Sequence, residues 1–222
     1  MFDKNLLEGK RILVTGGGSG LGKEMSRHFL TYGAEVIICG RRDEVLQKTA
    51  KELNDETKGK ITAHSLDIRD SLAIEETINN VFDEGPLDGL VNNAAGNFIS
   101  RTNDLSPNGF NAIASIVFHG TFNMTNTVGK KWIELKQPGT ILSITTTWVW
   151  TGSPFVVPSA MSKSGINAMT KSLAVEWGPH NIRLNCIAPG PFPTEGAWSR
   201  LSPDTEATEG AMDQSCLLYT SD

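Results

Sequence analysis

The sequence predicts an α/β fold, a parallel sheet wound in both directions (Rossmann-like) with helices on its two faces. Three observations predict it. Strand-like and helix-like segments alternate up to about residue 201, a glycine-rich turn joins the first strand to the first helix, and no repeat or low-complexity linker interrupts the order. The 222 residues fit one domain and are enough to cover such a sheet on both faces.

Composition narrows the function classes. The chain carries 20 Lys and Arg against 25 Asp and Glu, and this mild acidity argues against a nucleic-acid or membrane-surface role. The cysteines, Cys39, Cys186 and Cys216, lack metal-binding spacing, so we expect free thiols, a reducing cytoplasmic location and no metal. The sequence shows no signal peptide and no apolar stretch of membrane-spanning length.

The first strand, residues 12–15, leads into a turn made mostly of glycine. The glycines that define its spacing are Gly16, Gly18, Gly20 and Gly22. The next helix has an apolar stripe four residues apart, Leu21, Met25 and Phe29, and ends near Gly33. Free N–H groups at the start of this helix, beside a turn with little side-chain bulk, form a cradle for a phosphate group. The spacing G-x-x-x-G-x-G differs from the G-x-G-x-x-G dinucleotide fingerprint, so a tight turn without a ligand is the alternative.

The second strand, residues 35–39, is followed by Gly40-Arg41-Arg42. In a doubly wound sheet this turn lies beside the adenosine ribose, where an acidic residue selects NAD and an arginine accepts the 2′-phosphate of NADP. The turn contains no carboxylate before Asp43, so it favours NADP. Two solvated arginines at the start of the next helix, residues 45–53, are the alternative.

The third strand, residues 61–66, ends at Asp67. This carboxylate either accepts a hydrogen bond from an adenine amino group or caps the helix at residues 72–82. The fourth strand lies within residues 87–96 and ends in Asn92-Asn-Ala-Ala-Gly96. These small side chains let a flat ring pass close to the backbone.

Ser106-Pro107 predicts the start of a helical region that runs to about Leu135. His119 lies in its middle, where a histidine is more often a core residue than a catalyst. The fifth strand, residues 139–145, runs into a loop, and the helix at residues 158–177 carries Ser159 and Lys163 on one face. The sixth strand, residues 181–188, leads into Pro189-Gly-Pro-Phe192.

After Leu201 the apolar periodicity stops. We therefore expect one domain at residues 1–201 and an irregular segment at residues 202–222. Its last eight residues look unrelated to the preceding pattern, so we expect a non-native end; a disordered native tail is the alternative.

Four motifs in this order resemble one superfamily. They are Thr15-Gly-Gly-Gly-Ser-Gly-Leu-Gly22, Asn92-Asn-Ala-Ala-Gly96, Ser159-Ala-Met-Ser-Lys163 and Pro189-Gly190. With them, roughly residues 8–201 resemble the short-chain dehydrogenase/reductases. Three segments resemble the 2,4-dienoyl-CoA reductases, which reduce a conjugated dienoyl thioester with NADPH: Asn93-Ala-Ala-Gly-Asn-Phe-Ile-Ser100, Phe155-Val-Val-Pro-Ser159 and Pro189-Gly-Pro…Gly-Ala-Trp-Ser-Arg200. Members form tetramers and continue into a further helix and a seventh strand. We therefore expect the last strand to be missing here and the outer edge of the sixth strand to be unpaired.

The resemblance implies one site for an NADP cofactor and an acyl-CoA. The pyrophosphate would bind at Gly16, Gly18, Ser19, Gly20, Leu21 and Gly22, and the 2′-phosphate at Arg41 and Arg42. Adenine and its ribose would meet Asp67, Ile68, Asn93, Ala94 and Gly96. The nicotinamide and its ribose would meet Lys163, Pro189, Gly190, Pro191 and Phe192. The substrate would contact Arg69, Asn97, Phe98 and Arg200.

The sequence departs from the superfamily at the proton donor. Most members carry Tyr-x-x-x-Lys, whose tyrosine exchanges a proton with a carbonyl oxygen. Ser159 stands at that position, as in dienoyl-CoA reductases, and Trp148 stands where those enzymes supply a tyrosine from the preceding loop. An indole N–H donates a hydrogen bond but keeps its proton near neutral pH. Ordinary carbonyl reduction therefore loses support, whereas dienoyl reduction needs only donors that stabilise an enolate oxygen while water protonates carbon.

We expect Trp148 and His119, which stands near the family's asparagine position, to be these donors. Lys163 would bind the nicotinamide ribose and favour the enolate, Ser159 would either orient Lys163 or pack, and Thr146 would keep a hydroxyl near the substrate. The leading hypothesis is an NADPH-dependent reductase of unsaturated acyl-CoA in fatty-acid degradation. The alternatives are a carbonyl or alcohol oxidoreductase that uses Ser159, and an NADP-binding protein that lost its chemistry.

Overall fold

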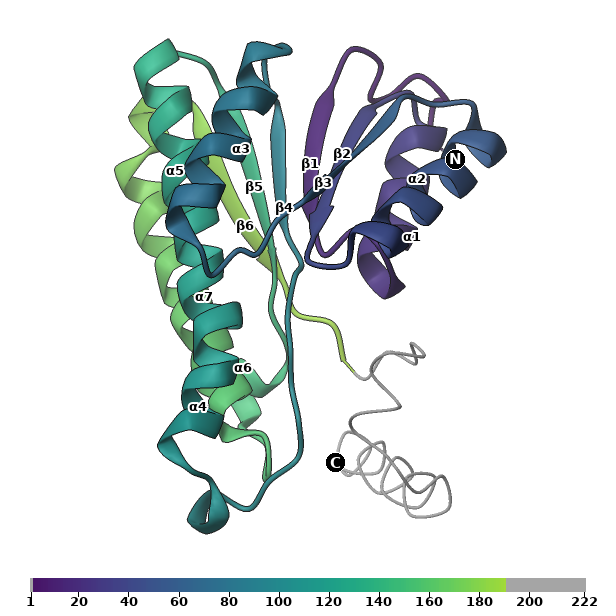
Figure 1. The fold of residues 1–222 in the computed structure, drawn as a ribbon. Coiled ribbons are helices and arrows are strands. Elements are labelled where there is room, and N and C mark those ends of the chain that lie inside the picture. The colour runs from purple at the N-terminus through teal and green to yellow at the C-terminus, as the bar shows by residue number, and fades with distance from the viewer. Residues whose placement is uncertain (1, 191–222) are drawn as a thin grey trace, which may run out of the picture.

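The computed structural model describes residues 2–190, which form a six-stranded parallel sheet with helices on both faces (Figure 1). The strand order is β3-β2-β1-β4-β5-β6, so the chain starts in the centre and builds outward in both directions. The strands are β1 (Arg11–Thr15), β2 (Glu35–Gly40), β3 (Ile61–Ser65), β4 (Gly89–Asn92), β5 (Gly139–Ile144) and β6 (Ile182–Ile187). The predicted fold class is confirmed, and the strand ends shift by at most one residue, except that β4 is confined to four residues of the predicted segment.

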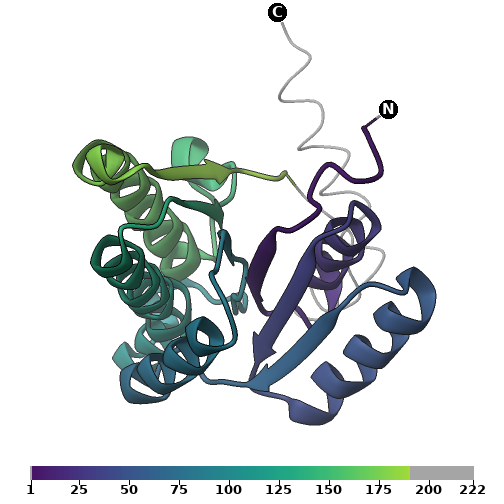
Figure 2. The same ribbon diagram turned by 90° about the horizontal axis from the view of Figure 1, so that it is seen from above.

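The helices divide between the two faces of the sheet (Figures 1 and 2). One face carries α1 (Gly20–Thr31) and α2 (Asp43–Thr57). The other carries α3 (Ser71–Asp83), α5 (Thr121–Leu135) and α7 (Val157–Glu176). Two shorter helices, α4 (Pro107–Ala114) and α6 (Trp148–Thr151), lie beyond the carboxyl ends of β4 and β5.

The two faces of the sheet bury two separate apolar clusters. Leu13 and Ile37 face the cluster with α3 and α5, whereas Val14 and Ile38 face the cluster with α1 and α2. These four side chains have no exposed surface, which is why β1 and β2 read as continuous apolar runs rather than as alternating patterns. Burial on both faces thus explains the strength of the strand signal in the sequence.

The face that α1 turns to the sheet differs from the predicted stripe. Its buried residues are Gly22, Ser26 and Leu30, whereas Met25 and Phe29 are only partly buried beside them. The Ser26 hydroxyl donates to the Gly22 carbonyl at 2.8 Å, so its polar group is satisfied within the helix. Small side chains let the helix axis approach the sheet closely, a feature that apolar periodicity alone does not reveal.

Local helix signals are confirmed in one case and corrected in another. The Ser106 hydroxyl caps α4 by accepting a hydrogen bond from the Gly109 N–H, with Pro107 at the first helical position. Asp67 does not cap α3. That role belongs to Asp70, whose carboxylate accepts from the N–H groups of Leu72 and Ala73.

The predicted helical region up to Leu135 is continuous but changes its geometry. Residues Ser115–Gly120 form a π-helical segment between α4 and α5, and His119 lies within it. Such segments disturb the side-chain spacing and often occur at functional sites. The loop expected after β5 contains the single turn α6, which begins at Trp148.

Within residues 2–190, β6 pairs with β5 and with no second strand. In the same part of the chain, no helix has the length and apolar character needed to cross a bilayer. Cys39 and Cys186 are free thiols, as predicted, although only Cys39 is fully buried. Cys216 and the proposed division at residue 201 lie outside the described residues.

Candidate functional site

The glycine-rich turn lies at the carboxyl end of β1, and its backbone is closely packed. Gly16 has φ +67°, and its N–H donates to the Cys39 carbonyl at 2.7 Å. A Cβ at Gly22 would overlap the Gly16 carbonyl and the Asn93 amide. Packing within the fold therefore requires glycine at both positions, so the number of glycines does not by itself distinguish a phosphate cradle from a tight turn.

The start of α1 gives the stronger indication of an anion site. Ser19 precedes the helix in an extended conformation, and its side chain makes no capping hydrogen bond. The first turn contains no acidic residue, and both Ser19 and Gly20 are exposed. The N–H groups of this turn are thus open, at the positive end of the helix dipole, where a phosphate group fits.

Thr15 and Asn93 hold the turn against β4. The Asn93 amide donates to the Thr15 carbonyl at 3.0 Å and to the Gly16 carbonyl at 3.4 Å. The Thr15 hydroxyl accepts from the N–H groups of Asn93 and Ala94, both at 3.0 Å. Asn93, predicted to line a ribose, has already committed both amide hydrogens to the turn, and the predicted ribose contact stays untested.

The turn after β2 presents two exposed arginines, Arg41 and Arg42, directly before α2. No hydrogen bond to another described residue occupies their guanidinium groups. Two cationic groups beside an open helix start fit a ligand with two separate phosphate positions. The predicted 2′-phosphate site at Arg41 and Arg42 stays a prediction.

Asp67 and Arg69, for which separate roles were predicted, form an ion pair. The Arg69 Nε lies 2.9 Å and 3.0 Å from the two carboxylate oxygens of Asp67, and the Arg69 N–H also donates to this carboxylate. Hydrogen bonds from Arg69 outweigh burial and lower the pKa of Asp67, and the charge of Arg41 adds to this effect. Ile68, between them, is buried against Gly120, so only its main chain remains for a ligand.

Lys163 lies on the buried face of α7 and donates to the Ile144 carbonyl at the end of β5. Its side chain is almost wholly enclosed, and burial lowers the pKa of the ammonium group to about 8. Ser159 is buried one turn away on the same face. No hydrogen bond joins the two side chains in the described part of the chain, so the packing role of Ser159 fits the structure better than an orienting role.

Trp148 is half-buried at the first position of α6, and Thr146 is half-buried just before it. Among residues 2–190, the Trp148 Nε1–H donates to no acceptor. The buried Trp132, in contrast, donates to the Leu87 carbonyl at 2.6 Å. Trp148 therefore has a free donor close to the end of β5, where Lys163 also lies. The Thr146 hydroxyl likewise has no partner in that part of the chain.

His119 does not join this group. Its ring is exposed and lies edge-on against Phe118, with 5.4 Å between the ring centroids. The interpretation as a core histidine is wrong because the side chain is on the surface. No hydrogen bond among the described residues connects it to Trp148 or Lys163, so its predicted role as a donor gains no support.

The segment after β4 separates the two residues predicted to line an acyl pocket. Asn97 Oδ1 is buried and has no hydrogen-bond partner within residues 2–190. Phe98 instead packs into the apolar cluster of Ile113, Val117 and Ile166. Phe98 is thus a core contact.

A hydrogen bond ties this segment to the loop before α7. The Ser100 N–H donates to the Phe155 carbonyl at 2.9 Å. Phe155 has φ +66°, an uncommon and strained conformation for a bulky residue. Ile99 and Phe155 are both about half exposed, so apolar surface borders the site here.

The end of β6 completes the described part of the site. The Thr145 hydroxyl donates to the Ile187 carbonyl at 3.0 Å and keeps this end of β6 beside β5. Pro189 and Gly190 follow directly. Three predicted residues, Pro191, Phe192 and Arg200, lie outside the described residues.

Sequence reasoning missed the polar residues whose hydrogen bonds support the strand ends and the turn of the site. Asn92 is buried and donates to Thr125 at 2.9 Å and to Ser143 at 3.4 Å. Thr49, on α2, donates to the Gly18 carbonyl at 2.8 Å. A threonine in a helix gives no local signal of such a bond, because its partner lies far away in the sequence.

The described residues contain no group of side chains arranged to bind a metal ion. They contain an open helix start, two arginines without partners among these residues, a carboxylate after β3, a buried ammonium at the end of β5, and a free indole N–H in the loop after β5. This arrangement fits a phosphorylated dinucleotide along the carboxyl ends of the strands, with a second ligand near β5.

Comparison with known proteins gives a family model and several close relatives. The model described as short chain dehydrogenase matches residues 10–204. An uncharacterized oxidoreductase of Caenorhabditis elegans is 48% identical over 199 residues, which are 88% of this chain and 63% of that protein. A protein of the same organism named as a probable 2,4-dienoyl-CoA reductase [(3E)-enoyl-CoA-producing] is 46% identical over 198 residues, 88% of this chain and 64% of that protein. The chain thus spans less than two thirds of the length of either relative.

Solved structures agree with these matches. A crystal structure of a short chain dehydrogenase from Bacillus anthracis superposes with a TM-score of 0.80 and 43% sequence identity. The match covers 83% of this chain and 75% of that one. The similarity therefore extends over both the glycine-rich turn and the region of Lys163.

Proposed function

Because the chain belongs to the short-chain dehydrogenase family, we propose that it is an oxidoreductase that reduces a 2,4-dienoyl-CoA with NADPH in fatty-acid degradation. The observation that carries this proposal is the buried Lys163 ammonium at the end of β5, close to the loop of Trp148, in a chain with no tyrosine at either family position. The printed name of the Caenorhabditis elegans relative supports the same substrate class.

The cofactor choice rests on the residues after β2. Arg41 and Arg42 are exposed cations with no partner among the described residues, and the turn after β2 contains no carboxylate before Asp43. Arginines bind a 2′-phosphate in charge-assisted hydrogen bonds, whereas an NAD site carries an acid here. The open N–H groups of α1 would hold the pyrophosphate. Bound NADPH would supply the hydride.

The chain's own residues would stabilise the charge that develops on the substrate. The hydride would add to C5 of the dienoyl group, so that negative charge builds on the thioester oxygen as an enolate. The Trp148 N–H can donate to that oxygen, and the Lys163 ammonium favours it electrostatically.

The same charge distribution decides the product. When C5 gains hydrogen, the C4–C5 electron pair would shift to form the C3–C4 double bond. Water would then deliver a proton to C2, where the C1–C2 pair of the enolate would form the new C–H bond as the thioester carbonyl returns. Hydroxide would remain to take a proton from solvent. The product would be a (3E)-enoyl-CoA, in agreement with the name of the relative. No side chain has to give up a proton, so an indole at position 148 is compatible with this reaction.

Two other functions are weaker. A carbonyl or alcohol oxidoreductase would need a proton donor at the oxygen, and Ser159 is a buried alcohol without a hydrogen bond to Lys163 among the described residues. An NADP-binding protein without catalysis is favoured by one observation, the indole at the place of the family's tyrosine. This alternative predicts that NADPH binds tightly and is not oxidised in the presence of any acyl-CoA.

The proposal is tested by following NADPH absorbance with a 2,4-dienoyl-CoA. Loss of one donor to an enolate costs on the order of a hundredfold in rate, so we expect Trp148→Phe to be slower by about this factor. Trp148→Tyr keeps a donor and should retain or exceed the parent rate. Trp150→Tyr, a change of the same kind at an exposed position of the same helix, should have no effect. Absence of turnover in the parent and in Trp148→Tyr, with NADPH still bound, would favour the non-catalytic alternative.

We also propose that the protein forms a homo-oligomer, as the family resemblance implies. Phe118, in the π-helical segment, packs against Gly165 of α7, and Phe122 and Met161 expose about half of their surface. Exposed apolar side chains in such a group suit a protein interface. The acyl-CoA as ligand and a reducing cytoplasmic location remain proposals of the same kind, the latter resting on the free thiols Cys39 and Cys186.

A further inference from the structure

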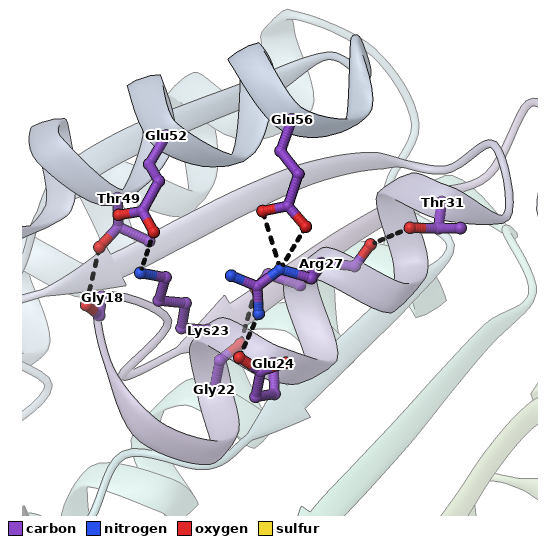
Figure 3. Close-up of polar contacts among 10 residues, drawn as sticks. Gly18, Gly22, Lys23, Glu24, Arg27, Thr31, Thr49, Glu52 and Glu56 are labelled. Atoms are coloured by element: carbon purple, nitrogen blue, oxygen red, sulfur yellow. Dashed lines mark hydrogen bonds and ion pairs between the residues drawn. The ribbon is translucent and has the colours of Figure 1, made fainter. Parts of the chain in front are cut away.

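Thr49 makes a hydrogen bond that its position in a helix does not predict. It lies within α2, is almost fully buried, and donates to the Gly18 carbonyl at 2.8 Å (Figure 3). Two other helical threonines bond within their own helix. Thr57 donates to the Leu53 carbonyl and Thr170 to the Ile166 carbonyl. Thr49 instead reaches across to the glycine-rich turn, 31 residues earlier in the sequence.

This bond determines the direction of the peptide that follows Gly18. In a planar trans peptide, the C=O of one residue and the N–H of the next point in opposite directions. Because the Gly18 carbonyl points to α2, the Ser19 N–H points to the opposite side of the turn. Ser19 is exposed and directly precedes α1, whose open N–H groups form the anion site.

Apolar side chains of α2 also pack against this peptide. A Cβ at Gly18 would lie 3.2 Å from a methyl carbon of Leu46 and 3.4 Å from one of Val45. Both residues belong to the first turn of α2, one turn before Thr49. The turn therefore packs against α2 at Gly18, and the hydrogen bond from the Thr49 hydroxyl determines the orientation of the Gly18–Ser19 peptide.

The contact between α1 and α2 continues along the same face of α2. Lys23 pairs with Glu52 at 2.8 Å and Arg27 with Glu56 at 2.9 Å, as Figure 3 shows. These pairs are partly exposed and each contributes little to stability. The Thr49 bond is part-buried whereas the two ion pairs are exposed, and it is the contact in this series that reaches a backbone group, so it can hold that group in one orientation.

We propose that Thr49 is a positioning residue for the phosphate groups of the dinucleotide. It acts through the Gly18–Ser19 peptide, whose N–H it turns toward the ligand. Because α2 begins directly after Arg41 and Arg42, one rigid helix places both the turn and the two arginines. This inference rests on the proposed cofactor, but the orientation of the turn exists without it.

Thr49→Val removes the hydroxyl and keeps the shape of the side chain. NADPH titrated against tryptophan fluorescence should bind the variant roughly fivefold to tenfold more weakly, the effect of one lost hydrogen bond to a carbonyl. Thr49→Ser keeps the hydroxyl and should restore affinity to within about twofold. Thr170→Val is the matched control, since Thr170 is equally buried and also donates to a backbone carbonyl at 2.8 Å. It should lower stability as much as Thr49→Val and leave NADPH affinity unchanged.

Hydrogen exchange without cofactor tests the orientation itself. In Thr49→Val the amides of residues 18–22 should exchange faster than in the parent, while in Thr170→Val they should not change. Unchanged exchange and unchanged affinity in Thr49→Val would overturn the proposal, and so would an equal loss of affinity in Thr170→Val. If the parent binds no NADPH, the proposed function fails, and faster exchange in Thr49→Val alone would then support the positioning role.

Discussion

Among single residues, Lys163 lies in an environment that changes its chemistry. It is 7% exposed, and its ammonium group donates to the Ile144 carbonyl. Burial lowers the pKa to about 8, because the charged form loses its hydration. Near neutral pH the group is still mostly charged, so it can favour an enolate, yet it is close to losing its proton.

The lowered pKa makes stability depend on pH in a defined direction. An unfolded lysine has a pKa of about 10.4, so between pH 8 and that value the unfolded chain binds more protons than the folded one. The free energy of unfolding should therefore rise with pH in this window because of Lys163, by roughly 3 kcal/mol at most. Urea denaturation of the parent and of Lys163→Met at pH 7.5 and 10 measures the difference. Lys171→Met, an exposed lysine of the same helix, is the control. A Lys163→Met variant with the same pH dependence as the parent would contradict the assignment.

Arg41 is the residue on which the choice of cofactor is best tested. A charge-assisted hydrogen bond contributes about 1.5–3 kcal/mol, so Arg41→Ala should weaken NADPH binding by roughly tenfold to a hundredfold. NADH lacks the 2′-phosphate, and its affinity should stay the same. Fluorescence titration with both nucleotides gives the two affinities, with Arg183→Ala on β6 as a control. Equal binding of NADPH and NADH by the parent would overturn the assignment of Arg41 and Arg42.

Among the elements, the contact between α5 and α7 depends on a glycine. Gly129 lies on the buried face of α5, and a Cβ there would overlap the ring edge of Trp177 at the end of α7. Trp177 is itself buried, so its ring has little room to move. This is the second helix in the chain, after α1, in which a small residue sets the distance to its neighbour.

Gly129→Ala should destabilise the protein although alanine favours helix formation. The gain in helix propensity is about 1 kcal/mol, whereas overpacking a core costs about 1–3 kcal/mol. We expect the cost of the overlap with Trp177 to exceed the gain in helix propensity. The urea concentration at the midpoint of unfolding should therefore fall. Gly178→Ala, where a Cβ would have no neighbour within 4 Å, is the control and should be close to neutral. A more stable Gly129→Ala would show that Trp177 moves aside freely.

For the whole molecule, Arg11 links three parts of the fold at the amino ends of the strands. Its guanidinium donates to Glu35 at 2.8 Å and to Glu84 at 2.7 Å, and also to the carbonyls of Val81 and Gly85 at 2.6 and 2.8 Å. Burial alone would raise the pKa of Glu35, but hydrogen bonds from Arg11 and Lys60 hold it below its usual range. One buried cation thus connects β1, β2 and the end of α3, on the side of the sheet away from the candidate site.

Arg11→Met should lower the free energy of unfolding by about 3 kcal/mol or more, because it leaves Glu35 without its buried partner. The depressed pKa of Glu35 contributes stability above its unfolded value, and that contribution is lost as the pH falls. The difference between parent and variant should therefore shrink below about pH 4. Urea denaturation at pH 7 and pH 3 measures it. Lys10→Met breaks only an exposed pair with Asp88 and should cost less than about 1 kcal/mol. Equal losses in the two variants would contradict the special role of Arg11.

The sequence by itself determined the features that depend on neighbours in the chain. Buried parallel strands read as apolar runs, so β1 and β2 and the alternation with helices could be predicted. The start of α4 at Ser106-Pro107 was also readable, because a cap forms between residues three apart. The motifs around Gly16 and Lys163 were sufficient for the family, since each occupies one short segment.

Only the tertiary structure decided how distant segments meet. It left His119 exposed, packed Phe98 into the core and directed Thr49 to Gly18. None of these follows from local pattern, because each depends on the relative position of elements that lie tens of residues apart or on the direction of one side chain. Packing between elements, and not the order of residues, therefore determines which of the predicted side chains are available to a ligand.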